Sequence, residues 1–268
     1  APIFIFMFDW GIRGAAIATV SAQVIALLWQ LKQFNNANEL LHFRRGIFRL
    51  KRKIVFDSLA IGMSPFLMNL AACLIVILIN QGLKKYGGDL AIGAFGIVNR
   101  LVFIVVMIVM GLNQGMQPIA GYNFGAKLYD RVNKVLKLTI IYATCVTTFG
   151  FLVGMLAPNL VVGIFTSDAE LTELSATGLR ITVMFFPIIG FQMVTSNFFQ
   201  SIGMAGKAIF LSLTRQMLIL LPCLLILPHF FGVAGVWYSM PVSDLLASLI
   251  ALVMLVYQFR KFKTAAAH

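Results

Sequence analysis

A single carboxylate, Asp244, lies well inside an apolar stretch of this sequence, and it is the residue best placed to take part in chemistry. An acid in such surroundings is costly, so it is expected either to bind a coupling cation or to pair with a basic side chain. The candidate basic partners are Arg180 and Arg215, which also lie among apolar residues. The sequence leaves both roles open, and Asp244 is therefore a candidate cation-binding residue.

Uncharged polar side chains occur in the other apolar stretches. Amides in such positions either line a wet cavity for a solute or hydrogen-bond a neighbouring helix, a contact that contributes about 0.6 kcal/mol. Pro65, Pro187 and Pro241 interrupt three of these stretches, and broken helices around a cavity are typical of transporters. The candidate substrate-cavity residues are Gln23, Asn69, Asn99, Gln192, Asn197 and Gln200.

The residue types that catalysis requires are not arranged for it. The histidines fall in predicted loops, at a span edge or in the tail, and the sequence has no Ser/His/acid set, HExxH motif, CxxC pair or phosphate-binding glycine loop. The three cysteines are far apart in apolar stretches and are interpreted as small buried hydrophobic residues: Cys73, Cys145 and Cys223. We therefore expect no enzyme, no metal centre and no cofactor.

The elements that position these polar residues are predicted to be membrane helices. Hydrophobic residues make up 60% of the chain and charged residues 11%, with a mean hydropathy of +0.93. A membrane-spanning helix needs about 20 predominantly apolar residues. The predicted spans are 11–33, 54–83, 90–113, 137–157, 174–202, 208–228 and 233–258. The fold class is thus an all-α, polytopic integral membrane bundle.

The net charge of +12 is explained by membrane topology rather than by nucleic-acid binding. Basic residues cluster at 44–53, 127–137 and 260–263, whereas the segment TSDAELTE at 166–173 is purely acidic. Connections rich in Lys and Arg stay in the cytoplasm. We therefore expect the N-terminus outside and the C-terminus in the cytoplasm.

The longest polar interruption, residues 35–53, separates two groups of spans. Leu40, Phe43 and Ile47 alternate there with basic residues. The segment is either an amphipathic helix on the inner leaflet or an ordinary cytoplasmic loop.

The two ends of the chain also resemble each other. GIRGAAIATVSAQ at 11–23 and GVAGVWYSMPVSD at 232–244 both place Gly-x-x-Gly before an apolar stretch. This similarity predicts that the chain covers part of a two-fold repeat and begins late in the first copy.

The stretch GLNQGMQPIAGYNFGAKLYDRVNKVLK, residues 111–137, resembles a signature of the multidrug and toxic compound extrusion (MATE) transporters. In that family such a run closes the second helix of each six-helix lobe on the cytoplasmic side. The residues that fit it are Gln114, Gln117, Pro118, Gly121, Tyr122, Asn123, Gly125 and Ala126. Residues 190–216 and 231–247 look like the DinF/MepA-like branch of the family, so the resemblance covers nearly the whole chain.

The resemblance implies twelve helices in two homologous lobes, with a cavity between the lobes. It assigns 1–34 to the end of the N-terminal lobe, 35–53 to a cytoplasmic amphipathic linker and 54–260 to the C-terminal six-helix lobe. We expect residues 261–268 to be a cytoplasmic tail and in part an appended sequence. The chain would then hold about seven of the twelve helices, and the missing N-terminal lobe is an expected partner.

The resemblance also implies a secondary active transporter in the bacterial cytoplasmic (inner) membrane. Such proteins export organic cations or drugs by Na⁺ or H⁺ antiport with alternating access. A threonine of the sixth helix belongs to the family's cation site and matches Thr19. The aspartate of that site is replaced in this sequence by Ala1. Another branch uses acids in the seventh and tenth helices, which this chain lacks apart from Asp57. The expected partners are the organic cation or drug, the lipid bilayer and the missing lobe.

Three alternatives stay open. A lipid-linked oligosaccharide flippase of the same superfamily needs a cationic cavity, which Arg100, Arg180 and Arg215 would supply. A seven-helix membrane receptor has the expected topology, although 233–258 contains no lysine to carry retinal. A purely structural membrane subunit is the third alternative.

Overall fold

The computed structural model describes residues 11–36 and 50–266. The chain divides into two compact units, Ala1–Ile61 and Gly62–His268. The first unit contains helix α1 (Gly11–Phe34) and the first turns of α2 (Arg52–Gly125). Residues 37–49 of the predicted amphipathic segment at 35–53 lie outside the described residues.

Helix α2 is broken at Gly88, where φ is 67° and ψ is −164°. Glycine adopts this conformation readily because it has no Cβ, whereas a side chain would be strained there. Leu83 before the break and Ala91 after it belong to the same buried hydrophobic cluster. The prediction of two separate helices at 54–83 and 90–113 is therefore confirmed.

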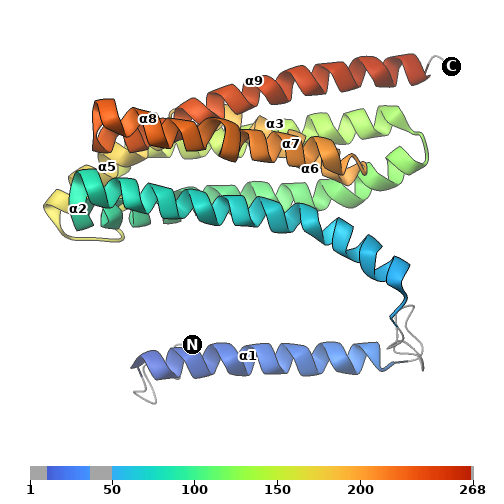
Figure 1. Cartoon of the computed structure of the whole chain (residues 1–268), viewed down its shortest axis with the longest axis horizontal. Helices are drawn as coiled ribbons and strands as arrows, with labels where there is room; N and C mark the ends of the chain where they lie inside the picture. The colour runs from blue at the N-terminus through green and yellow to red at the C-terminus, as the bar shows by residue number, and fades with distance from the viewer. Residues whose placement is uncertain (1–10, 37–49, 267–268) are drawn as a thin grey trace. The chain divides into compact units, whose positions relative to one another are not determined.

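After α2 the described chain forms eight further helices, of which the long ones run along the second unit (Figure 1). They are α3 (Tyr129–Leu156), α4 (Pro158–Val162), α5 (Ala169–Val183), α6 (Phe186–Ser201), α7 (Ala205–Leu213), the π-helix η2 (Thr214–Leu220), α8 (Leu221–Phe231) and α9 (Val233–Ala266). Helices α5 and α6 meet at an angle of 55°. Pro187 lies in the first turn of α6, where its missing N–H costs no helical hydrogen bond. The predicted span 174–202 is therefore a bent pair of helices.

The surface of the second unit matches a bilayer rather than water. Four stretches of the described residues are long and apolar enough to cross a membrane: Phe66–Gly125, Tyr129–Leu156, Gly206–Phe231 and Val233–Phe259; the bent pair of α5 and α6 makes a fifth. The break at Gly88 divides the first of these into two, so six of the seven predicted spans lie in this set. Over its described residues, helix α1 is not among the stretches that are long and apolar enough to cross a membrane.

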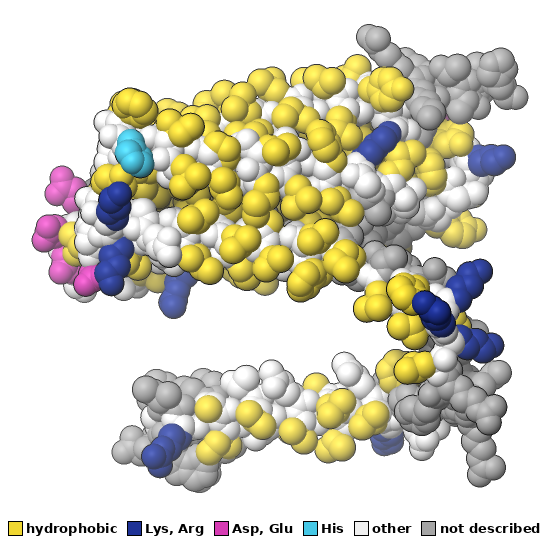
Figure 2. Space-filling view, in the orientation of Figure 1, with side chains coloured by type: hydrophobic (Ala, Val, Ile, Leu, Met, Phe, Trp, Pro, Cys, Tyr) yellow, Lys and Arg dark blue, Asp and Glu magenta, His cyan; other side chains and the backbone are white. Residues whose placement is uncertain are grey.

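Figure 2 shows hydrophobic side chains over the lateral surface of the second unit and acidic side chains gathered at one end. Among the exposed apolar residues are Ile104, Phe149 and Val253. The expectation that the three cysteines are buried is wrong. Cys73 and Cys145 are exposed and Cys223 is half-buried, because apolar residues of a membrane helix need not face the protein interior.

Two buried clusters hold the helices of this unit together. The first gathers Phe95, Phe186 and Trp237 around the bend between α5 and α6. The second gathers Met116, Phe198 and Phe199. Helices α3 and α6 approach closely at Gly190, where an added Cβ would lie 2.9 Å from the carbonyl oxygen of Ala143.

Candidate functional site

The second unit has a partly open cavity of about 260 Å³ between both arms of α2, α5, α6, η2 and α9, which we call the central cavity. Most of its wall is apolar, with Ile75, Phe95 and Ile189 among the lining side chains. Its polar lining residues are Asn99, Thr182, Arg215, Gln216, Ser243 and Asp244. Ligand sites commonly combine such apolar walls with a few polar groups that orient the ligand.

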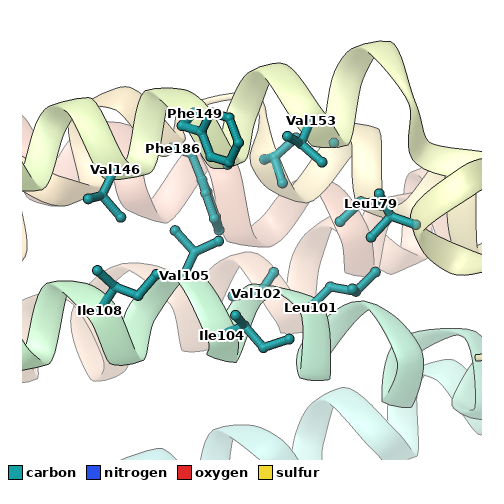
Figure 3. Close-up of a pocket in the computed structure, with 14 residues that line it drawn as sticks. Leu101, Val102, Ile104, Val105, Ile108, Val146, Phe149, Val153, Leu179 and Phe186 are labelled. Atoms are coloured by element: carbon teal, nitrogen blue, oxygen red, sulfur yellow. The ribbon is translucent and has the colours of Figure 1, made fainter. Parts of the chain in front are cut away.

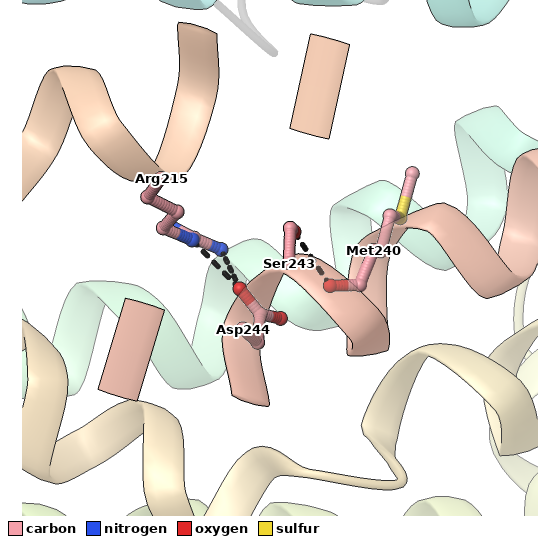
Figure 4. Close-up of polar contacts among 4 residues, drawn as sticks. All are labelled: Arg215, Met240, Ser243 and Asp244. Atoms are coloured by element: carbon pink, nitrogen blue, oxygen red, sulfur yellow. Dashed lines mark hydrogen bonds and ion pairs between the residues drawn. The ribbon is translucent and has the colours of Figure 1, made fainter. Parts of the chain in front are cut away.

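An ion pair between Arg215 and Asp244 is the main polar feature of the central cavity. Arg215 Nε donates a hydrogen bond of 2.7 Å to Asp244 Oδ1, and the second guanidinium nitrogen, Nη2, lies 2.6 Å from the same oxygen (Figure 4). The Asp244 side chain is 4% exposed and that of Arg215 is 32% exposed. The ion pair that the sequence allowed for Asp244 is thus present, with Arg215 as the partner. Arg180 is exposed and does not line the cavity.

Arg215 is held by an irregular piece of helix. It lies in η2, whose bonds span five residues instead of four, and such π-helical turns occur frequently at functional sites. The neighbouring hydroxyl, Thr214 Oγ1, is buried without a hydrogen-bond partner among the described residues. The local geometry therefore leaves a polar group unsatisfied while it directs Arg215 toward α9.

The other polar groups of the central cavity are disposed mainly as hydrogen-bond acceptors. Ser243 Oγ donates to the carbonyl of Met240 at 2.7 Å (Figure 4), and Thr182 Oγ1 donates to that of Gly178 at 2.8 Å. Because each hydroxyl has one hydrogen, these oxygens can only accept a bond from a ligand. Gln216 Oε1 is buried and has no donor among the described residues.

The structure brings only two of the predicted site residues to this cavity, Asn99 and Asp244. Gln192 is buried but does not line it. Asn197 Nδ2 donates to the carbonyl of its own helix at Met193, 2.9 Å away. The remaining predicted residues are exposed: Gln200 on α6, Asn69 on α2, and Thr19 and Gln23 on α1 in the first unit.

Thr182, Gln216 and Ser243 line the cavity but were not among the predicted cavity residues. Serine and threonine are frequent in membrane helices, where they often bond their own backbone, so their type gives little signal. The tripeptide Thr214–Gln216 was the available clue, since it places three polar residues together at the start of an apolar span.

The signature residues lie at the end of α2, outside the central cavity. Asn123 is buried, and its Nδ2 donates to the carbonyl of Ile119 at 2.8 Å. Its own carbonyl accepts a bond of 2.9 Å from the amide of Leu128. Gly121 packs against the backbone of Ser201, with an added Cβ only 3.0 Å from that carbonyl oxygen. Gln114, Gln117, Pro118 and Gly125 are exposed. The motif therefore shapes the turn between α2 and α3.

A second hollow of about 220 Å³, the apolar groove, lies between α2, α3 and α5. Figure 3 shows its wall, which includes Val105, Phe149, Val153 and Leu179. Phe186 lines both this groove and the central cavity. The groove lining is apolar, so this surface cannot orient a charged solute.

Comparison with known proteins gives consistent relatives. The family model described as MatE matches residues 60–226. The multidrug export protein MepA of Staphylococcus aureus (strain MSSA476) is 28% identical over 263 residues, which cover 97% of this chain and 56% of MepA. The multidrug transporter DinF-BH, solved in complex with rhodamine 6G, is 36% identical with a TM-score of 0.83, over 97% of this chain and 58% of that one.

An outward-facing multidrug resistance MATE family transporter of the MOP superfamily has the same fold. It is 22% identical with a TM-score of 0.85, over 98% of this chain and 59% of that one. The predicted resemblance and the all-α membrane fold are thereby confirmed. The chain spans little more than half the length of these relatives.

Proposed function

This chain belongs to the MatE family, and from that premise we propose that it is the C-terminal part of a two-lobe transporter that exports organic cations and drugs. The observation that carries the proposal is the 36% identity to DinF-BH, a multidrug transporter solved with rhodamine 6G, over 97% of this chain. The central cavity supports it, because it offers apolar walls for an organic body and one carboxylate oxygen, Asp244 Oδ2, that Arg215 does not engage.

In this proposal the described second unit is the C-terminal lobe and α1 is the last helix of the N-terminal lobe. The rest of the N-terminal lobe is the missing partner, in keeping with the 56% of MepA that the chain covers. The two lobes form the walls of the transport path and expose it alternately to either side of the bilayer.

The coupling ion in this proposal is Na⁺ or H⁺, and the cation-binding groups are Thr19 and Asp244. Only one oxygen of Asp244 is engaged by Arg215. A cation that reaches this carboxylate therefore binds at Oδ2, or displaces the guanidinium. The membrane is the bacterial cytoplasmic membrane, with the N-terminus outside and the acidic end of the lobe, which carries Asp168 and Glu170, on the same side.

The flippase alternative is less well supported by the central cavity. A pyrophosphate site needs an excess of positive charge. Of the three arginines considered, Arg215 alone lines the cavity, and it is neutralised by Asp244. Arg100 and Arg180 are exposed.

The test is efflux of rhodamine 6G from bacterial cells that express the complete reading frame to which this chain belongs. We expect faster loss of the dye than from cells with an empty vector, and collapse of either the Na⁺ or the proton gradient identifies the coupling ion. Efflux equal to the vector control, with the protein present in the membrane, would refute the proposal. The chain of residues 1–268 expressed alone serves as the comparison for the role of the missing lobe.

A further inference from the structure

The Arg215–Asp244 pair leaves one charged group of each sign available to a ligand. Nε and Nη2 of Arg215 both contact Asp244 Oδ1, and Figure 4 shows both dashed lines ending on that single oxygen. Among the described residues, Asp244 Oδ2 accepts no hydrogen bond. The remaining guanidinium nitrogen, Arg215 Nη1, donates none. A fork-to-fork arrangement would have used both oxygens.

We propose that the central cavity binds zwitterionic amphiphiles, molecules that carry an ammonium and a carboxylate close together on an apolar body. The carboxylate of the ligand accepts hydrogen bonds from Arg215, and its ammonium donates to Asp244. The inference rests on the proposed function in one respect: ligand must reach the cavity in the assembled protein.

The charge balance of the cavity favours this class over simple ions. An organic cation has to share Asp244 with the guanidinium beside it, and an organic anion is repelled by Asp244. A zwitterion places each of its charges against the opposite charge of the pair. In a cavity with apolar walls these attractions are stronger than in water, because the surrounding dielectric constant is low.

The uncharged polar groups fit an ammonium as the second recognition element. An ammonium has three N–H donors and no acceptor. Gln216 Oε1 is buried without a donor among the described residues, and Ser243 Oγ has already given its hydrogen to Met240. Both line the same cavity as Asp244 and both act as acceptors. Asn99, with an amide that can donate, is the group available to a ligand carboxylate beside Arg215.

The pair is also hard to explain as a stabilising device. Ion pairs with a buried partner commonly contribute less than well-packed apolar side chains of the same size, because the buried charge, here that of Asp244, loses its hydration. Here the pair occurs with a π-helical turn and with a cavity-lining oxygen, Gln216 Oε1, that is buried without a partner in the described part of the chain. A ligand that satisfies some of these groups accounts for their presence.

Three dansyl probes that share one fluorophore and nearly one tether separate the charge classes. Nε-dansyl-lysine carries the ammonium and the carboxylate, dansylcadaverine carries the ammonium alone, and N-dansyl-6-aminohexanoate carries the carboxylate alone. Binding is measured as the rise in dansyl emission on titration into the complete protein in lipid nanodiscs. We expect the dissociation constant of dansyl-lysine to be about tenfold lower than that of either other probe, the change given by one added charge-assisted contact.

The selectivity of two single variants gives the sharper test. Arg215→Gln leaves Asp244 as the only charge, so dansylcadaverine becomes the preferred probe. Asp244→Asn leaves Arg215, so dansylaminohexanoate becomes preferred. The exposed Arg180→Gln is the matched control and keeps the wild-type order. If a single variant fails to fold, the exchanged pair Arg215→Asp/Asp244→Arg retains both charges and is expected to retain the preference for dansyl-lysine.

Equal affinity for the three probes, or an unchanged order in both single variants, would overturn the inference. Absence of probe binding in a protein that exports rhodamine 6G overturns it while the proposed function stands. Selective binding of dansyl-lysine in a protein that exports no rhodamine supports the inference and counts against the proposed function.

Discussion

The two partners of the Arg215–Asp244 pair are buried to different extents, and this difference predicts unequal costs of removing them. Arg215→Met leaves a carboxylate that is 4% exposed without its partner, and an uncompensated buried charge costs about 3–5 kcal/mol. Asp244→Asn leaves a guanidinium that is 32% exposed. That group keeps part of its hydration, so we expect a loss of about 1–2 kcal/mol.

The assay is thermal or denaturant unfolding of the purified protein in one detergent, with the same detergent for every variant. A change of 1 kcal/mol corresponds to about 2–4 °C in Tm for a domain of this size. Arg215→Met is therefore expected to lower Tm by about 6–20 °C, and Asp244→Asn by a few degrees. The apolar double variant Arg215→Met/Asp244→Leu, which buries no charge, is expected to recover most of the loss.

Two results would refute this reasoning. A loss for Asp244→Asn at least as large as that for Arg215→Met would mean that exposure does not decide the cost. Additive losses in the double variant would mean that the two side chains do not stabilise each other.

The other predictions concern packing and exposure. Gly190→Val is expected to destabilise the protein by about 1–3 kcal/mol in the same unfolding assay, because its side chain meets the backbone of Ala143 on α3. Trp237→Ala, which removes a side chain that is 3% exposed, is expected to cost about 3–5 kcal/mol. Cys73 and Cys145 are exposed and lie on predicted spans, so in membranes they are expected to react with a lipid-soluble maleimide and not with a membrane-impermeant one, as followed by mass spectrometry.

Each of these has a control. Gly96→Ala introduces a Cβ with nothing within 4 Å and is expected to leave the stability unchanged or slightly higher, whereas an equal loss at Gly96 and Gly190 would contradict the packing argument. For Trp237, Phe149→Ala is the comparison, because Phe149 is 69% exposed and its truncation leaves no buried hole. Labelling of Cys73 or Cys145 by the impermeant reagent would place them in water.

The helices could be predicted from the sequence because a bilayer demands long apolar runs, and such runs are visible without any alignment. Of the three prolines expected to interrupt apolar stretches, Pro187 does lie at a bend, whereas that expectation is wrong for Pro65 and Pro241, through which α2 and α9 continue as helices. The orientation of each helix about its axis could not be predicted. A helix that is apolar all round gives no periodic signal, so Asn99, which lines the cavity, and Gln192, which does not, looked equivalent.

The sequence allowed Asp244 either to bind a cation or to pair with an arginine, and it offered Arg180 and Arg215 as the possible partners. The structure selects Arg215 over Arg180 because η2 faces α9, and a π-helical turn has no recognised signature in the residues that form it. The hydroxyls of Thr182 and Ser243 were missed for a related reason, since their role depends on where their single hydrogen is donated.

The equal and opposite charges of Arg215 and Asp244 have a consequence for energetics across the bilayer. Moving one elementary charge through the membrane potential involves about 2.3 kcal/mol per 100 mV. The pair carries no net charge, so carrying it through the field as a unit involves none of this energy and the field acts only on its short dipole; a bound zwitterion likewise adds no net charge. An ion that loads or leaves this site without a counter-charge adds net charge to the moving lobe, and the voltage dependence of transport therefore reports that charge.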